Sequence, residues 1–127
     1  QMACGEATAP LAQTCWHADN SSGKTQRIGL LAPNTNGLHD MKGNVKEWVR
    51  DVFAPYPGGN QKDWVNDAGG LNHILRGGSW KSPPQHCRAD ARFKPRTGYK
   101  GNDAGFRLAL VFEKEATSET TGPNLDF

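Results

Sequence analysis

The chain has little apolar sequence. Hydrophobic residues make up 35% of its 127 residues, and no apolar run approaches the roughly 18 residues typical of a transmembrane helix. A basic segment followed by an apolar one, as in a signal peptide, is not visible either. We therefore expect no direct insertion into a membrane. We also expect a thin core, to which the four tryptophans contribute much of the buried area.

An excess of charge of one sign is also missing. The 15 Lys and Arg residues nearly balance the 13 Asp and Glu residues, which leaves a net charge of +2. This balance gives no electrostatic reason to expect a nucleic acid or an anionic membrane as a partner. The 15 glycines and 8 prolines interrupt the chain too often for a coiled coil or a helical bundle. A loop-rich globular domain with short strands and little helix remains.

Short apolar or alternating stretches predict the strands, and clusters of Gly, Pro and Asn predict the loops between them. The expected strands cover residues 26–32, 45–52, 73–80, 88–94 and 105–112. Residues 1–9 resemble the end of a helix, and residues 54–72 form a long polar loop. From Glu113 onward the composition is typical of a solvated tail.

Cysteine is scarce, and its count of three is odd. Cys4 and Cys15 flank a segment that resembles a loop, and a disulfide between them would indicate an oxidising compartment. The alternative is two buried free thiols. Cys87 follows a turn-rich sequence that favours an accessible loop, where the neighbouring His86 could lower the pKa of its thiol or be incidental.

One segment has the spacing of a metal site, Asp40-x-x-Gly43-x-Val45-x-Glu47. Two carboxylates flank a glycine that permits an unusual turn, so that nearby carbonyl oxygens can face inward. Carboxylate and carbonyl oxygens are the ligands that calcium prefers. The alternative is a surface ion pair with one of the nearest cations, Lys42, Lys46 or Arg50.

Four arginines lie in or beside the expected strands, where a guanidinium usually binds carbonyls or carboxylates of its own fold, with anion binding as the alternative: Arg76, Arg88, Arg92 and Arg107. The four histidines are dispersed and lack the spacing of a zinc site. Several aromatic and polar residues fall on or beside the two C-terminal loops, where they suit ligand binding: Trp80, His86, Phe93 and Tyr99. Trp80 and Phe93 could equally fill the core.

Four motifs in order resemble the formylglycine-generating enzyme (sulfatase-modifying factor) family. They are Gly37–Trp48, Leu75–Trp80, Arg88–Arg92 and Gly105–Ala109. The resemblance implies an α+β fold, the family's variant of the C-type lectin fold, with short mixed strands and much irregular loop.

The family domain is about twice as long as this chain. The resemblance therefore implies that residues 1–112 are the C-terminal half of such a domain, followed by a polar tail over residues 113–127. It further implies that the expected partner is the N-terminal half of the same parent protein, as a separate chain or fragment.

Enzymes of this family bind calcium through the first motif. The matching ligands here are the side chains of Asp40 and Glu47 and the carbonyls of Gly43 and Val45. The resemblance thus makes calcium the expected cofactor. Together with the Cys4–Cys15 pair, it favours a periplasmic or extracellular location.

The family enzymes oxidise a substrate cysteine with two cysteines five residues apart and a bound copper. The matching positions here are Ser82 and Cys87. A hydroxyl is a poor replacement for one of two soft thiolate ligands, so copper binding and formylglycine formation are not expected.

We therefore expect a non-catalytic, calcium-stabilised binding or regulatory module. Its protein or small-molecule ligand would contact loop residues, of which the best candidates are Trp80, His86, Arg88 and Tyr99. The segment that carries them, residues 80–104, corresponds roughly to the hypervariable segment of retroelement variable proteins with this fold. The alternative is an oxidoreductase that acts on a cysteine-containing or small-molecule substrate, with Cys87, Ser82 and Ser79 lining its pocket.

Overall fold

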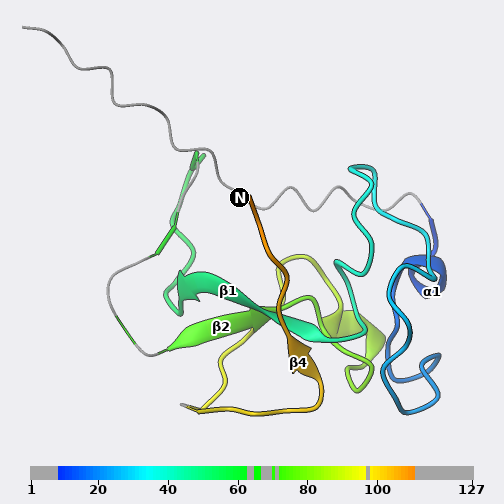
Figure 1. Ribbon diagram of the computed structural model, residues 1–127. Helices are drawn as coiled ribbons and strands as arrows, with labels where there is room; N and C mark the ends of the chain where they lie inside the picture. Colours follow the sequence, from blue (N-terminus) through cyan, green and yellow to red (C-terminus); the bar gives the residue numbers. More distant parts are fainter. Residues whose placement is uncertain (1–8, 63–64, 67–69, 71, 97, 111–127) are drawn as a thin grey trace, which may run out of the picture.

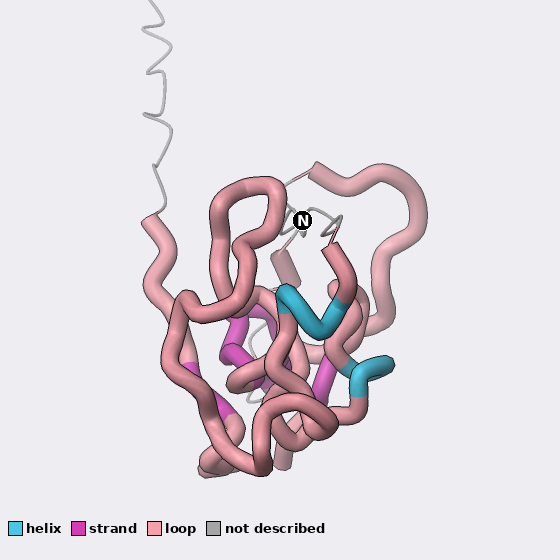
Figure 2. Tube along the Cα trace, turned by 90° about the vertical axis from the view of Figure 1, so that its right-hand side faces the viewer, coloured by secondary structure: helices cyan, strands magenta, loops and turns pink. Residues whose placement is uncertain are grey.

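A computed structural model describes residues 9–62, 65, 66, 70, 72–96 and 98–110. Its elements are α1 (Leu11–Thr14), β1 (Lys46–Val52), β2 (His73–Arg76), a 3-10 turn (Pro84–His86), β3 (Arg92–Phe93) and β4 (Ala104–Gly105). Irregular loop makes up most of the described chain (Figure 2). No helix in these residues is long and apolar enough to cross a membrane.

The strands form one sheet in the order β3-β2-β1-β4. β1 and β2 are antiparallel and lie side by side at its centre, while β4 runs parallel to β1 on the other side (Figure 1). Beyond the sheet, Trp16 forms an isolated parallel bridge with Gly43. This bridge attaches the segment after α1 to the loop that precedes β1.

Two of the predicted strands are largely confirmed. Alternation over residues 45–52 corresponds to β1, and the first half of 73–80 corresponds to β2. β2 ends at Arg76 because Gly77 and Gly78 follow with φ of 92° and 73°, in the left-handed region that interrupts an extended strand. The described part of the 54–72 loop contains no further element.

The other three strand predictions are wrong in whole or in large part. Residues 26–32 form an irregular loop with a turn at Ile28 and Gly29, because Gly29 has a φ of 73° in the middle of the expected strand. Residues 88–91 form a turn, so that only β3 remains of the segment 88–94. The predicted strand 105–112 retains Gly105 alone up to residue 110, where the described chain ends.

The core is small, as expected, but its composition differs from the prediction. Its most buried side chains are Ile74, Leu75, Cys15, Cys87, Ser21 and Ser79. Trp16 and Trp80 are only half-buried, and Trp48 is exposed. Trp64, the expected helix end over residues 1–8 and the expected tail lie outside the described residues. α1 lies in a segment where we expected only loop.

Candidate functional site

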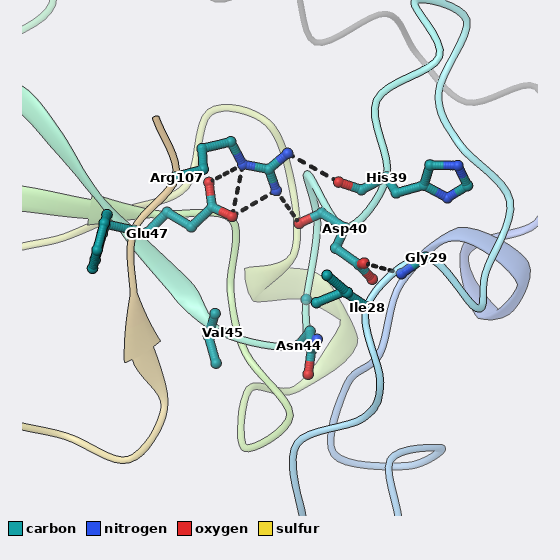
Figure 3. Close-up of a pocket in the computed structure, with 10 residues that line it drawn as sticks. Ile28, Gly29, His39, Asp40, Asn44, Val45, Glu47 and Arg107 are labelled. Carbon is teal, nitrogen blue, oxygen red and sulfur yellow. Dashed lines mark hydrogen bonds and ion pairs between the residues drawn. The ribbon is translucent and has the colours of Figure 1, made fainter. Parts of the chain in front are cut away.

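The four residues of the calcium prediction lie together. Asp40, Gly43, Val45 and Glu47 line a pocket of about 550 Å³, at the junction of residues 39–47 (a loop and the start of β1), the turn at Gly29 and the segment after β4 (Figure 3). Apolar walls come from Ile28 and Phe106. The pocket therefore combines two carboxylates with an apolar rim.

The loop that forms this pocket has an unusual backbone. Asp40, Gly43 and Asn44 all have positive φ, of 54°, 79° and 60°. A side chain at Gly43 would collide with the segment after α1, since its Cβ would lie 2.2 Å from the carbonyl oxygen of Trp16. Glycine is therefore required where the loop bridges to Trp16, both for conformation and for space.

Arg107 closes the pocket. Its Nε donates to both carboxylate oxygens of Glu47, at 2.9 and 2.7 Å, and a terminal nitrogen donates to Oε1 at 2.6 Å. The same guanidinium donates to the carbonyls of His39 and Asp40, each at 3.1 Å (Figure 3). The hydrogen bonds to Glu47 raise the pKa of Arg107. Arg107 is the partner of Glu47 that sequence reasoning missed.

The donor set in this pocket is suitable for a hard cation. It contains carboxylate oxygens from Asp40 and Glu47 and carbonyls of a turned backbone. Both carboxylates have partners within the protein, because Asp40 accepts from the Gly29 N–H at 2.8 Å. No cluster of three or more His, Cys, Asp or Glu side chains occurs in residues 9–110 as described. Calcium would compete with Arg107 for Glu47.

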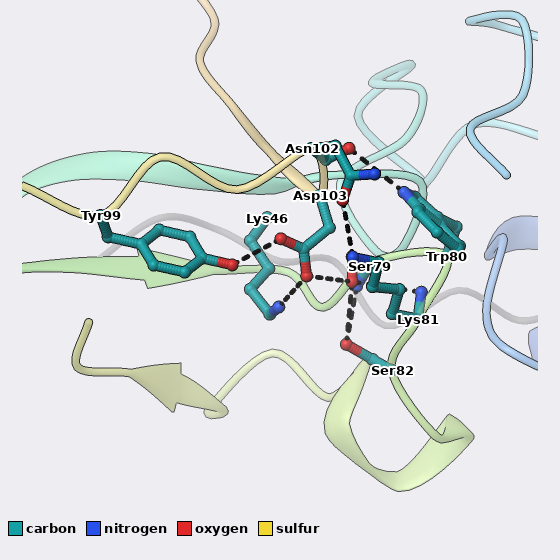
Figure 4. A network of polar contacts seen from close by, with 8 residues as sticks. All are labelled: Lys46, Ser79, Trp80, Lys81, Ser82, Tyr99, Asn102 and Asp103. Carbon is teal, nitrogen blue, oxygen red and sulfur yellow. Dashed lines mark hydrogen bonds and ion pairs between the residues drawn. The ribbon is translucent and has the colours of Figure 1, made fainter. Parts of the chain in front are cut away.

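A buried polar network lies around Asp103 (Figure 4). Its carboxylate accepts from Lys46 Nζ at 2.6 Å, from the Tyr99 hydroxyl at 2.6 Å and from the Ser79 hydroxyl at 3.3 Å. Burial alone would raise the pKa of Asp103, but the hydrogen bonds from Lys46 and Tyr99 lower it to about 2. Asp103 was not predicted as a site residue.

Ser82 belongs to this network. Its hydroxyl accepts from the Ser79 N–H at 3.0 Å and lies 3.2 Å from the Ser79 hydroxyl (Figure 4). Both serines are buried. The network thus connects three of the predicted site residues, Ser79, Ser82 and Tyr99, through the carboxylate of Asp103. The spacing of these residues in the sequence does not predict that Asp103 joins them.

Cys87 is fully buried, which corrects the expectation of an accessible loop. Burial follows from Gly78, since a Cβ there would lie 2.7 Å from the Cys87 sulfur. Cys15 is also a buried free thiol, so the predicted Cys4–Cys15 disulfide is wrong for Cys15, while Cys4 lies outside the described residues.

The two described thiols face each other. A hydrogen bond from Cys15 lowers the pKa of Cys87, while the same bond and burial raise the pKa of Cys15. The sequence offered no signal for this contact, because it depends on how the segment after α1 lies against the region of Ser82, where the Ala18 N–H donates to the Ser82 carbonyl at 2.9 Å.

A second pocket, of about 210 Å³, is lined by residues that include Gly78 and Ser82. Its walls are formed by Lys46, Leu75, Arg76, Gly78, Ser82, His86, Ala91, Arg92 and Phe93. The two arginines donate to neutral acceptors: Arg76 to the Ala89 carbonyl at 3.0 Å and the Tyr56 hydroxyl at 2.8 Å, and Arg92 to the Ala54 carbonyl. The pocket is therefore cationic.

The predicted ligand-binding residues do not all gather at this pocket. His86 lines it, and Tyr99 lies in the Asp103 network. Trp80 donates its ring N–H to the Asn102 carbonyl at 3.3 Å and lies under Lys81. Arg88 is exposed and forms an ion pair with Asp90. As predicted, all four arginines of the sequence analysis bind carbonyls or carboxylates of their own fold.

Comparison with known proteins identifies the family. The chain matches the family model described as "Sulfatase-modifying factor enzyme 1-like domain" over residues 3–111. It is 32% identical over 114 residues to a serine/threonine-protein kinase pkn1 of Chlamydia pneumoniae, with 84% of this chain and 17% of that protein covered. It is also 31% identical over 97 residues to the formylglycine-generating enzyme of Streptomyces coelicolor, with 72% of this chain and 31% of the enzyme covered.

Solved structures agree on the fold. Treponema denticola variable protein 1 superposes with a TM-score of 0.70 and 34% identity over 79% of this chain and 37% of that one. PvdO from Pseudomonas aeruginosa superposes with a TM-score of 0.63 and 26% identity over 80% of this chain and 40% of its own. The chain spans less than half the length of each of these relatives. It has their α+β, C-type-lectin-like fold, and it belongs to the formylglycine-generating enzyme (sulfatase-modifying factor) family.

Proposed function

We propose that this domain is a non-catalytic binding or regulatory module. The observation that carries the proposal is Ser82, at the position of one of the two family cysteines. Its hydroxyl is committed to two contacts with Ser79 in the buried Asp103 network. A residue that fixes the backbone in this way supports the fold and supplies no soft ligand for copper.

The cationic pocket beside Ser82 is the proposed ligand site. Lys46, Arg76 and Arg92 line it, and no carboxylate occurs among its described lining residues. Within the part of the chain that the structure describes, Lys46 forms an ion pair with Asp103, and neither arginine has a carboxylate within ion-pair distance. Among the described residues, both arginines donate their hydrogen bonds to neutral oxygens, although the charge of Arg76 also helps to lower the pKa of nearby Asp90. A ligand with a negatively charged or strongly hydrogen-bond-accepting group fits this pocket best.

Calcium is the proposed structural cofactor. Asp40 and Glu47 would supply carboxylates, and Gly43 and Val45 would supply carbonyls. Four of its liganding residues already line one pocket, and bound calcium would neutralise their charge and stabilise the loop. A periplasmic or extracellular location is part of the same proposal, because calcium is abundant there.

The N-terminal half of the family domain is the proposed partner. Phe106, Leu108 and Leu110 are 76%, 91% and 82% exposed, and Ile28 is 80% exposed. Exposed apolar side chains in such number are typical of a surface that is covered in the assembled protein. The remaining part of the family domain, supplied by the parent protein, is the occupant that we propose for it.

The alternative function is an oxidoreductase. The observation that favours it is the Cys87 thiol, whose pKa is lowered by the hydrogen bond from Cys15. Such a thiol is a better nucleophile at neutral pH than an ordinary cysteine. Its substrate would be a cysteine-containing peptide or a small molecule that enters beside Ser82.

Oxygen consumption distinguishes the two functions. The protein is purified with the rest of its parent domain, loaded with copper(I), and supplied with a cysteine peptide in an oxygen electrode cell. The formylglycine-generating enzyme of Streptomyces coelicolor serves as the positive control. We expect no turnover above the copper-only rate. Turnover that disappears in a Cys87→Ala variant would establish the alternative.

A further inference from the structure

Two thiols from distant parts of the sequence meet in the core. Cys15 follows α1, Cys87 follows the 3-10 turn, and both are 0% exposed. They lie where two backbone segments meet, because the Gly43 N–H donates to the carbonyl of Gly77, the neighbour of Gly78, at 2.7 Å, and the two thiols interact there. Each sulfur also packs against the bare backbone of a glycine, since a Cβ on Gly43 would lie 2.7 Å from the Cys15 sulfur and one on Gly78 would lie 2.7 Å from the Cys87 sulfur. The glycines leave room for the sulfurs and for little else.

The position of Gly78 places one of the thiols next to a pocket. Gly78, Ser82 and His86 all line the cationic pocket, and Cys87 follows His86 directly. The Cys87 sulfur packs against Gly78, which lines this pocket, whereas the Cys15 sulfur packs against Gly43, which does not. Because both thiols are 0% exposed, a small reagent in this pocket reaches Cys87 when the wall at Gly78 opens locally.

We propose that Cys15 and Cys87 are a redox-active pair that forms a disulfide by exchange with a small-molecule disulfide of the glutathione class. The inference does not rest on the proposed binding function. It replaces the expected Cys4–Cys15 cross-link with one that joins α1 to the loop after Ser82.

The exchange balances in two steps. The Cys87 thiolate attacks one sulfur of the small disulfide, so that a mixed disulfide forms and one small thiolate leaves. Cys15 then loses its proton and attacks the Cys87 sulfur, which forms the internal disulfide and releases the second small thiolate. The two protons lost by the cysteines go to the two released thiolates. The protein is oxidised by two electrons and the small disulfide is reduced by two.

Oxidation has a structural consequence. The carbonyl of Cys15 accepts from Asn20 at 2.9 Å, and the next residue, Trp16, holds Asn44 through its carbonyl at 2.9 Å. A covalent bond at this point would fix the N-terminal segment, the 39–47 loop and the loop after Ser82 to one another. The long chain between the two cysteines makes the gain large, and we expect the midpoint of thermal unfolding to rise by roughly 10–20 °C.

The test uses the full chain at neutral pH. The folded protein is incubated with oxidised glutathione, remaining thiols are alkylated, and the unreduced digest is analysed by mass spectrometry. We expect a loss of two hydrogen atoms and a cross-linked peptide that contains Cys15 and Cys87. A Cys4→Ser variant is the matched control and should form the same cross-link. In a Cys15→Ser variant, Cys87 should stop at the mixed disulfide with glutathione.

Two results would overturn the proposal. One is that, after incubation of the folded protein in excess oxidised glutathione, both thiols are still free and become alkylated once the protein is unfolded in denaturant. The other is a cross-link that joins Cys4 to either of them. Both results are read from the unsubstituted protein, so they remain decisive even if a cysteine variant fails to fold. Neither result bears on oxygen turnover or on ligand binding at the cationic pocket, so the proposed function is tested separately.

Discussion

Two ion pairs in this domain start from neighbouring residues and behave differently. Lys46 and Glu47 are consecutive in β1, so their side chains leave the strand on opposite faces. Lys46 meets Asp103 with side chains 13% and 5% exposed, whereas Glu47 meets Arg107 with side chains 19% and 37% exposed. One strand thus supplies a buried network on one side and a wetter pocket on the other. The first suits a structural role and the second suits an exchangeable ligand.

The largest effect should come from breaking the buried pair. Asp103→Ala removes the partner of Lys46, Tyr99 and Ser79. We expect the free energy of unfolding to fall by about 3–5 kcal/mol, because an uncompensated charge is left in the interior. Urea unfolding measures the loss. The matched control is Asp90→Ala at the exposed pair with Arg88, which should cost less than about 1 kcal/mol. Equal losses of unfolding free energy in the two variants would show that the buried pair stabilises the fold no more than the exposed pair does.

Calcium should act on the pocket lined by Asp40 and Glu47, and it should leave the Asp103 network unchanged. At a concentration about a hundredfold above its dissociation constant, calcium should stabilise the protein by about 2.7 kcal/mol. Thermal unfolding after chelation and after calcium addition measures the gain. Glu47→Gln should abolish it, because a carboxylate ligand is lost.

Asp51→Asn, farther along β1, controls for a general effect of removing a negative charge, and its calcium response should match that of the unsubstituted protein. A full calcium response in the Glu47→Gln protein would rule out this pocket as the site.

Acid should weaken the buried network. The folded pKa of Asp103 is about 2, below the ordinary value of 3.8. The stability that this depression contributes is therefore present above about pH 4 and is lost as the pH falls toward 2. We expect a loss of roughly 2 kcal/mol from this group over that range. In an Asp103→Asn variant, the fall in unfolding free energy between pH 4 and pH 2 should be smaller by that amount. If the unfolding free energy of the variant fell as much between pH 4 and pH 2 as that of the unsubstituted protein, the Asp103 carboxylate would not be stabilised by Lys46 and Tyr99.

The smallest effect should come from breaking the partly exposed ion pair between Arg107 and Glu47. Without calcium, Arg107→Gln should lower the free energy of unfolding by about 1 kcal/mol, since the pair is partly solvated. The cost should shrink further in 0.5 M salt, because exposed charges are screened. The cost of Asp103→Ala should change little under the same conditions. Urea unfolding at two salt concentrations makes the comparison, and a salt-insensitive Arg107 effect would contradict it.

The strands that could be predicted are those whose apolar alternation has a partner in the described chain. β1 alternates and pairs with β2, and its limits were predicted to within a residue. The segments 26–32 and 105–112 have strand-like composition too, yet Ile28, Phe106 and Leu108 are exposed. Composition predicts a tendency to bury these side chains, but it does not say which surface will cover them.

The candidate site was predicted where its residues are close in sequence. The loop from Asp40 to Glu47 lines one pocket as its spacing suggested. Asp103, Arg107 as the partner of Glu47, and the Cys15–Cys87 contact were missed, because each joins segments that only the tertiary fold brings together. Odd cysteine counts and isolated arginines have too many possible partners for spacing to decide among them.

The alternation at Lys46 and Glu47 also fixes how β1 can align with its neighbours. A shift of the strand by one residue in one direction would bring Glu47 to the place of Lys46, toward Asp103, and a shift in the other direction would bring Lys46 to the place of Glu47, toward Arg107. Each shift would break both native pairs and create one pair of like charges, so a misaligned sheet would be penalised in either direction. Two adjacent residues of opposite charge thereby specify the register of the central strand, independently of the apolar residues that build the core.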